Sequence, residues 1–258
     1  MMGLRFDHLS LALRGRQVLR DVSGHFPPAS VTVILGANGA GKSTLLACLA
    51  ALRTTDSGEV TLDGKPLLAI PPMERARQIG LLPQQADIHW DINVRALVAL
   101  GRLPHHGRWG RRAADEAAID EAMAQTDCAR FAQRKAQRLS GGEQARVLLA
   151  RVLAGKPDWV LADEPLANLD PAHQLDAMAC FRAAASAGAG VALVLHDLTQ
   201  AARIADHLIV MKEGGIIASG PKAQVLTPAV LEAAYGVRVY IGQDETGAPV
   251  IAPVSRVA

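Results

Sequence analysis

The sequence predicts an α/β fold in which a mostly parallel sheet, covered by helices, is joined by an antiparallel β subdomain and an inserted helical subdomain. Three observations support this prediction. Short apolar runs typical of buried strands alternate with helical segments through most of the chain. The segment before residue 35 instead alternates apolar and polar residues, as antiparallel strands do. Residues 90–138 hold no strand-like run and are rich in Ala, Arg, Glu and Asp, which favours helices.

The predicted elements, taken in order, divide the chain into a core and an insertion. Strands are expected at Leu4–Leu13, Gln17–Phe26, Val31–Leu35, Gly58–Gly64, Ile79–Leu82, Asp158–Ala162, Val191–Leu195, Leu208–Met211 and Ile216–Ala218. Helices are expected at Leu45–Ala50, read as amphipathic, at Ala113–Thr126 and from about Glu143. We interpret residues 1–258 as a single domain, with an α/β core at 1–86 and 139–236, a helical subdomain at 87–138 and a C-terminal extension at 237–258.

The composition excludes several classes of protein. The chain has 258 residues, of which 50% are hydrophobic and 20% charged, so it is expected to be globular. A formal net charge of +2 gives no support to a nucleic-acid partner held by bulk charge. The cysteines are too few and too far apart for a metal finger, and their sparse count suits a reducing compartment. Without a signal peptide or a run of about 20 apolar residues, we expect a cytosolic protein that reaches membranes through a partner.

The most specific motif is a glycine-rich turn between a predicted strand and a predicted helix. It consists of Gly36, Ala37, Asn38, Gly39, Ala40, Gly41, Lys42, Ser43 and Thr44. Glycines at this spacing let successive backbone N–H groups turn inward around a polyphosphate, and the helix N-terminus favours the same negative charge. In such a turn Lys42 reaches the β- and γ-phosphates, and the Ser43 hydroxyl is a ligand for Mg²⁺. The segment therefore predicts nucleotide binding.

Two of the predicted strands end in polar side chains suited to hydrolysis. Asp163 and Glu164 follow Asp158–Ala162, and His196 follows Val191–Leu195. In open α/β sheets such strand ends lie beside the phosphate loop. Asp163 fits the carboxylate that organises the metal, and Glu164 would polarise the attacking water, with His196 one strand over. The alternative readings are a helix cap for the two carboxylates and a structural role for the histidine.

A second candidate anion site is formed by Leu139, Ser140, Gly141, Gly142 and Glu143. Ser140 is expected to cap the helix that begins near Glu143, and the two glycines leave N–H groups of its first turn uncovered. Ser-Gly-Gly occurs in many loops, so the motif is weak by itself. Its presence in the same chain as the phosphate loop makes it specific.

Together these segments resemble the ATP-binding subunits of ABC transporters, over essentially the whole chain. The resemblance implies a P-loop NTPase core with a helical subdomain of the ABC ATPase type, and hydrolysis of ATP with Mg²⁺. It also implies a head-to-tail dimer, in which the phosphate loop of one copy and the Ser-Gly-Gly of the other enclose each ATP. It matches Gly36–Thr44 to the Walker A loop, Gln84 to the Q-loop glutamine, Leu139–Glu143 to the signature, Asp163 to the Walker B aspartate, Glu164 to the catalytic glutamate, Asp170 to the D-loop aspartate and His196 to the switch histidine.

The same resemblance implies the roles of these residues. Catalysis would involve Glu164, His196 and Gln84, and Mg²⁺ would be held by Ser43, Gln84 and Asp163. ATP would be contacted by the Walker A residues Gly36–Thr44, by Asp163, and by Ser140, Gly141, Gly142, Glu143 and Asp170.

Several softer features are similar to the importers of iron–siderophore complexes, haem and cobalamin. They are Leu100–His105, Glu143 in place of the usual Gln, Asp170–Gln174, and the tail from Leu226 to Val237. The narrower resemblance implies a membrane permease, a periplasmic or extracellular substrate-binding protein, and a location on the cytoplasmic face of the membrane. The alternatives are the motor of an exporter, which shares the ATP residues, and a soluble ABC ATPase outside transport. Members of that last class usually carry a long coiled coil or two fused cassettes.

Two positions depart from the family pattern, and one loop is a candidate docking surface. The place of the aromatic residue that stacks on adenine is assigned to Leu13, so base recognition is expected to be loose. Ala162 is smaller than the usual residue before the Walker B aspartate. The basic loop Arg102–Arg112, with Trp90 and Trp109, is expected to supply anchors for the permease beside Gln84. The alternative reading of this loop is a solvated connector.

Overall fold

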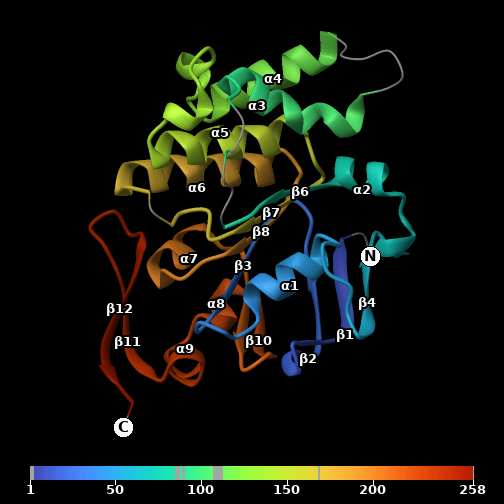
Figure 1. The fold of residues 1–258 in the computed structure, drawn as a ribbon. Coiled ribbons are helices and arrows are strands. Elements are labelled where there is room, and N and C mark those ends of the chain that lie inside the picture. Colours follow the sequence, from blue (N-terminus) through green and yellow to red (C-terminus); the bar gives the residue numbers. More distant parts are fainter. Residues whose placement is uncertain (1–2, 85–87, 89–90, 107–112, 168, 258) are drawn as a thin grey trace.

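The structure is a computed structural model that describes residues 3–84, 88, 91–106, 113–167 and 169–257 (Figure 1). The strands are β1 (Leu4–Leu13), β2 (Arg16–Phe26), β3 (Val31–Gly36), β4 (Ser57–Leu62), β5 (Lys65–Pro66), β6 (Ile79–Leu82), β7 (Trp159–Asp163), β8 (Gly190–Val194), β9 (His207–Lys212), β10 (Gly215–Pro221), β11 (Val237–Gln243) and β12 (Pro249–Arg256). The α-helices are α1 (Lys42–Leu49), α2 (Pro72–Gln78), α3 (Val94–Ala99), α4 (Ala113–Gln125), α5 (Gly141–Ala154), α6 (Pro171–Ser186), α7 (Leu198–Ile204), α8 (Lys222–Val225) and α9 (Pro228–Tyr235). Short 3₁₀ helices are η1 (Leu67–Ala69), η2 (Leu100–His105), η3 (Ala129–Phe131) and η4 (Ala136–Arg138). A search of the described residues finds no helix with the length and apolar character to span a bilayer.

The predicted α/β fold is confirmed. A six-stranded sheet has the order β10-β9-β3-β8-β7-β6, and only the β9–β10 hairpin within it is antiparallel. A separate antiparallel sheet has the order β2-β1-β4-β5. Because β3, β8, β7 and β6 are parallel neighbours in that order, their carboxyl ends follow one another along the same edge of the large sheet.

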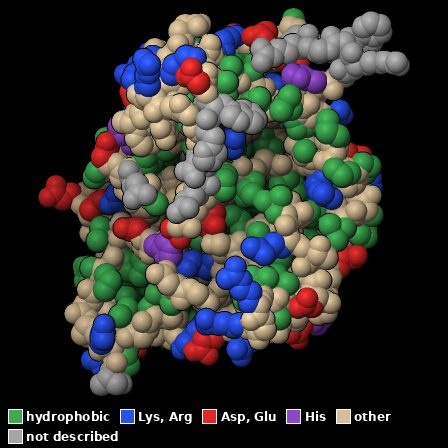
Figure 2. Space-filling view, in the orientation of Figure 1, with side chains coloured by type: hydrophobic (Ala, Val, Ile, Leu, Met, Phe, Trp, Pro, Cys, Tyr) green, Lys and Arg blue, Asp and Glu red, His purple; other side chains and the backbone are tan. Residues whose placement is uncertain are grey.

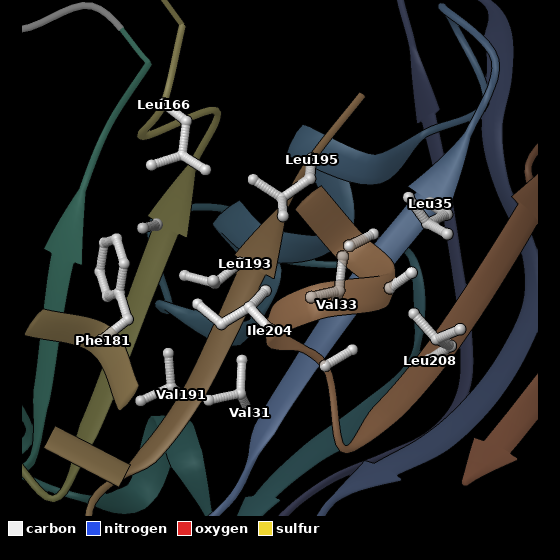
Figure 3. Close-up of a cluster of buried hydrophobic side chains, with 14 of the residues drawn as sticks. Val31, Val33, Leu35, Leu166, Phe181, Val191, Leu193, Leu195, Ile204 and Leu208 are labelled. Atoms are coloured by element: carbon white, nitrogen blue, oxygen red, sulfur yellow. The ribbon is translucent and has the colours of Figure 1, made fainter. Parts of the chain in front are cut away.

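The two faces of the large sheet are covered by different elements. Alternate side chains of β3 and β8, among them Val33 and Leu193, pack with Phe181 of α6 and with residues of α7 (Figure 3). The intervening side chains, including Ile34 and Val194, pack with α1 and with the antiparallel sheet. Strands buried on both faces consist of uninterrupted apolar residues, which is why the sequence marked them clearly.

Helix α1 differs from the prediction at its start. It begins at Lys42, directly after the glycine-rich turn, rather than at Leu45. Its buried residues, among them Leu45, Leu46 and Leu49, lie on one side of the helix, and Ser43 on the other side is exposed. The buried side packs in the apolar cluster between the large sheet and the antiparallel sheet.

The helical lobe lies above the core in Figure 1 and has its own apolar cluster. Residues of α3 and α4 pack there with Val147 and Ala150 of α5, while Leu149 on another face of α5 joins the cluster on the large sheet. Helix α5 is therefore shared by both parts. The packing of the lobe extends to Ala154, beyond the boundary that the sequence predicted at residue 138.

Only part of the loop proposed as a docking surface lies among the described residues. Arg108, Trp109 and Arg111 lie outside the described residues, as does Trp90. Arg102 is described, and its assignment to a solvated or docking loop is wrong. Its side chain is buried, with Nε donating to Asp115 at 2.8 Å and one terminal nitrogen donating to the carbonyl of Ala154 at 3.0 Å. A buried cation needs such partners, so Arg102 ties the lobe together.

The C-terminal extension forms the antiparallel hairpin β11–β12 at one edge of the molecule (Figure 1). Ile251 of β12 is buried against the large core, and its backbone forms two hydrogen bonds with the Thr199 hydroxyl of α7, at 3.0 and 2.9 Å. Arg203 of α7 also pairs with Asp244 at 2.7 Å. The sequence had suggested no structure for this segment.

Candidate nucleotide-binding and hydrolysis site

The polar strand ends predicted from the sequence converge in the structure. The glycine-rich turn follows β3, His196 follows β8 by two residues, Asp163 ends β7, and Gln84 follows β6 by two residues. These four strands are neighbours in the sheet, so their ends face one region. A cleft of about 920 Å³ opens there, lined by Gly39, Lys42, Ser43, Gln84, Glu164 and His196 among others. The arrangement is that of a ligand site at the carboxyl edge of a parallel sheet.

The glycine-rich turn requires glycine at the points where the backbone approaches other segments. Gly36 has φ +148, and a Cβ on it would lie 2.3 Å from the carbonyl oxygen of Met211. Gly41 has φ +100, and its Cβ would lie 2.8 Å from the carbonyl oxygen of Val18. Side chains at these two positions are therefore excluded by conformation and by space. The turn leads directly into the first turn of α1, whose residues Lys42, Ser43 and Thr44 line the cleft. A helix N-terminus in this position favours an anion such as phosphate.

Lys42 is buried beneath this turn. Its ammonium donates to the carbonyl oxygens of Gly36 at 2.8 Å and Ala37 at 3.1 Å. Burial lowers its pKa, while the nearby carboxylates of Glu164 and Asp163 act in the opposite direction. An ammonium held by two neutral carbonyls still has a third proton to donate, which suits it to bind a phosphate oxygen.

Asp163 and Ser43 meet across the sheet edge. The Ser43 hydroxyl donates to Oδ1 of Asp163 at 3.0 Å. Burial raises the pKa of Asp163, and the hydrogen bond from Ser43 offsets part of that effect. A hydroxyl and a carboxylate are hard oxygen ligands that suit Mg²⁺, which commonly binds one or two protein groups together with phosphate oxygens and water. The two side chains therefore fit the metal predicted for this site.

Glu164 is held on both of its carboxylate oxygens. Oε1 lies 2.5 Å from Nε2 of His196, and Oε2 accepts a hydrogen bond from the Gln84 amide at 2.8 Å. Its backbone has φ +51, a conformation uncommon outside glycine, and its N–H donates to the carbonyl of Val194 at 3.1 Å. The side chain is 17% exposed. A carboxylate fixed in this way beside a phosphate site can accept a proton from a water molecule.

Comparison with known proteins agrees with this geometry. The family model for the ABC transporter domain matches residues 19–167, more than half of the chain. The chain is 42% identical to the hemin import ATP-binding protein HmuV of Rhodococcus jostii RHA1, over 97% of this chain and 86% of that protein. It is 40% identical to the ferric enterobactin transport ATP-binding protein FepC of Escherichia coli K12, over 99% of this chain and 95% of that protein. The chain belongs to the ABC transporter ATP-binding family.

The fold agrees with this membership. An ABC transporter of the metal-chelate type, solved in an inward-facing conformation, superposes with a TM-score of 0.85, at 22% identity and 98% coverage of both chains. ATP hydrolysis is the activity of this ABC ATPase, and residues that the sequence predicts to bind nucleotide line the cleft beside the glycine-rich turn.

The segment that the sequence assigned to the signature, Leu139–Glu143, is not among the described residues that line that cleft. Ser140 caps α5 by accepting from the N–H of Glu143 at 3.3 Å, and the Glu143 carboxylate accepts from the N–H of Ser140 at 2.8 Å. This pair of bonds is a capping box. Gly142 faces His173 of α6, where a Cβ would approach Nδ1 to 3.2 Å. Ser140 is not among the described residues that line the cleft.

The aspartate assigned to the D-loop also caps a helix. Asp170 accepts from the N–H of His173 at 3.0 Å, and this hydrogen bond is the main cause of its lowered pKa. Its other oxygen lies 2.6 Å from Nδ1 of the same histidine. Asn168, in the same segment, lies outside the described residues.

Leu13, which the sequence assigned to the adenine site, is not among the described residues that line the cleft. Leu13 pairs with Arg16 at the close of the β1–β2 hairpin and packs against the apolar cluster beside α1. The described residues that line the cleft on this side are Arg16, Gln17, Val18 and Arg20. The turn that follows Leu13 reverses the chain, and the first cleft-lining residue after it is Arg16, which pairs with Leu13 across the hairpin.

Sequence reasoning missed a further group of cleft-lining residues, part of which lies beside β2, where the Gly214 carbonyl accepts a hydrogen bond from the N–H of Arg20 at 2.8 Å. Lys212, Glu213 and Gly214 line the cleft from the β9–β10 turn, and Ala234 lines it from α9. Next to Ala234, the hydroxyl of Tyr235 accepts a hydrogen bond from the N–H of Gly36 at 2.8 Å. The sequence indicates the tail motif Tyr235-Gly236-Val237 only as a subfamily feature. No local pattern relates it to a residue 199 positions away.

Proposed function

We propose that this ABC ATPase hydrolyses ATP to power the import of a metal chelate, namely an iron–siderophore complex, haem or cobalamin, through a partner permease. The observation that carries this proposal is the similarity, over nearly the whole chain, to import ATP-binding proteins for hemin and ferric enterobactin. The substrate itself is selected by the permease and by a substrate-binding protein outside the membrane. The chain would therefore act at the cytoplasmic face, bound to the permease.

The working unit is proposed to be a head-to-tail dimer. Ser140, Gly141 and Gly142 do not line the cleft of their own chain, although helix N-termini with uncovered glycines are typical anion sites. The signature of a second copy would complete the site by facing the phosphates that the first copy holds in its glycine-rich turn. The family resemblance predicts the same arrangement.

Within each site we assign the following steps to the chain's own residues. Backbone N–H groups of the glycine-rich turn and the Lys42 ammonium bind the phosphates. Ser43 and Asp163 would hold Mg²⁺, which would supply positive charge to the phosphates. Glu164 orients water and takes its proton, because Gln84 and His196 fix its carboxylate toward the cleft.

Gln84 is also placed to connect hydrolysis with the permease. It contacts Glu164 and lies at the junction between β6 and the helical lobe. A permease segment seated in that junction would respond to nucleotide only if the junction changed shape on binding. We therefore propose that Gln84→Ala reduces substrate-stimulated hydrolysis in the assembled transporter.

The test is reconstitution. The tagged chain would be purified from native membranes with its permease and placed in liposomes that contain ATP. Uptake of haem, ferric siderophore and cobalamin would then be measured with the copurifying binding protein. ATP-dependent uptake of one of these chelates supports the proposal. Transport in the opposite direction, or uptake only of unrelated solutes, would contradict it.

A further inference from the structure

The nucleotide site has a contact from the C-terminal part of the chain that its proposed chemistry does not use. Gly36, the last residue of β3, donates its N–H to the hydroxyl of Tyr235, the last residue of α9. The registered pairing of β3 with β8 ends two residues earlier, at Ile34. The phenol therefore provides an acceptor at the point where the strand leaves that ladder and the glycine-rich turn begins.

The backbone of Gly36 is also held by Lys42. The Gly36 carbonyl accepts a hydrogen bond from Lys42 at 2.8 Å. Gly36 has no side chain and cannot carry one, since a Cβ would collide with the Met211 carbonyl. Its conformation, with φ +148, is therefore fixed by the contacts of its backbone, which include the pairing with Met211 of β9. Within the part of the chain described, the Tyr235 hydroxyl and Lys42 are the side-chain contacts made to this residue's N–H and C=O groups.

The surroundings of Tyr235 hold its hydroxyl in place. The ring packs against the large apolar cluster, and burial raises the pKa of the phenol to about 12. The hydroxyl is therefore neutral at physiological pH. Helix α9 is fixed at its end by Gly236 in the left-handed conformation, and Lys212 donates to the carbonyl of Ala233 at 2.8 Å.

We propose that Tyr235 is a positioning residue for the glycine-rich turn, which acts by fixing the Gly36 peptide and, through it, the carbonyl that holds Lys42. When phosphate binds, the third proton of the Lys42 ammonium is available to a phosphate oxygen, and the other two remain with the carbonyls of Gly36 and Ala37. The position of the Gly36 carbonyl therefore influences where the ammonium lies. The inference rests on the ATP site and not on the transported substrate, so its failure would leave the import proposal untouched.

The test uses the two tyrosines of the chain as a matched pair. Tyr235→Phe removes only the hydroxyl and leaves the Gly36 N–H without its acceptor, whereas Tyr240→Phe changes a side chain that is 59% exposed on β11. We expect Tyr235→Phe to raise the KM for Mg·ATP roughly five- to tenfold and to change kcat less than about twofold. Tyr240→Phe should leave both constants at their wild-type values. A merely structural loss would lower the active fraction, and hence kcat, without this split.

Hydrogen exchange provides a second measurement that does not depend on enzyme kinetics. The Gly36 amide of the wild-type protein should be protected without nucleotide, and in Tyr235→Phe the faster exchange should be confined to the peptide around residues 31–40. An unchanged KM in Tyr235→Phe, or rapid exchange of Gly36 in the wild type, overturns the proposal.

Discussion

Two glycine-rich segments of this chain lead into helices, and the backbone N–H groups at the starts of those two helices differ in their hydrogen-bond partners. Helix α1 begins after Gly41 in the left-handed conformation, and no side chain of the described residues caps it. Helix α5 begins after Ser140 with a complete capping box, in which Glu143 also places a carboxylate in the first turn. The N–H groups at the start of α1 therefore remain available to a ligand. At the start of α5, part of the N–H groups is already hydrogen-bonded by the side chains of Ser140 and Glu143.

The difference explains why one segment forms a site in the single chain and the other does not. An uncapped helix N-terminus with inward N–H groups favours an anion, and Lys42 adds a positive charge beneath it. At α5 the negative charge of Glu143 opposes a second anion, although Arg134 lies 3.1 Å from it and balances that charge in part. The signature segment is therefore expected to bind phosphate only when a second copy presents a nucleotide already neutralised by its own lysine and metal.

The largest expected effect concerns the water-positioning carboxylate beside the first segment. Glu164→Gln keeps the hydrogen-bonding shape but cannot take a proton, so hydrolysis should fall by roughly 10²–10⁴-fold. Binding of Mg·ATP should persist and trap the ATP-bound dimer, seen by size-exclusion chromatography. Glu121→Gln, at a surface ion pair with Lys156, is the control. Near-normal turnover in Glu164→Gln would remove this residue from the mechanism.

The second prediction separates the two glycine-rich segments directly. Lys42→Ala should abolish measurable nucleotide binding by the monomer, because the phosphates lose their buried cation. Ser140→Ala should leave monomer affinity within about twofold while costing about 1 kcal/mol of stability through loss of the cap. It should also weaken the ATP-induced dimer. Fluorescent ATP titration and analytical ultracentrifugation measure the two quantities. Equal losses of monomer affinity in both variants would contradict the contrast drawn between α1 and α5.

The third prediction concerns the base end of the cleft. Arg16 is exposed on the cleft wall, and a guanidinium over the face of a base contributes about 0.5–1 kcal/mol. Arg16→Ala should therefore weaken ATP binding about two- to fivefold, as measured by calorimetry. Leu13→Met should have no effect on affinity, because Leu13 packs away from the cleft. A loss of affinity at Leu13 instead of Arg16 would restore the assignment made from the sequence.

The smallest expected effect is the acid sensitivity of the capping box. The backbone N–H of Ser140 lowers the pKa of Glu143, with Arg134 adding to the effect. The folded state therefore binds fewer protons than the unfolded state. This contribution to stability is present above the unfolded pKa and is lost as pH falls through the folded pKa. Glu143→Gln should consequently lose less stability than the wild type between about pH 5 and about pH 3. Urea unfolding across that range measures the difference, and parallel losses in both proteins would contradict it.

Local sequence by itself determined the parts of this protein that depend on neighbouring residues. Buried strands need continuous apolar residues, the turn before Lys42 needs glycines where φ is positive, and Ser140 with Glu143 at the third helical position specifies a cap. The convergence of Asp163 with Ser43 also followed, because parallel strands end at one edge of a sheet. These relations act over a few residues or through a regular sheet.

Tertiary structure decided what depends on contacts between distant segments. The register of the β1–β2 hairpin places Arg16, and not Leu13, on the cleft. Arg102, which the sequence placed in an exposed loop, is buried in an ion pair with Asp115. The approach of Tyr235 to Gly36 joins segments 199 residues apart. No periodicity encodes such pairings, because they arise from the way whole elements pack once their apolar faces are buried.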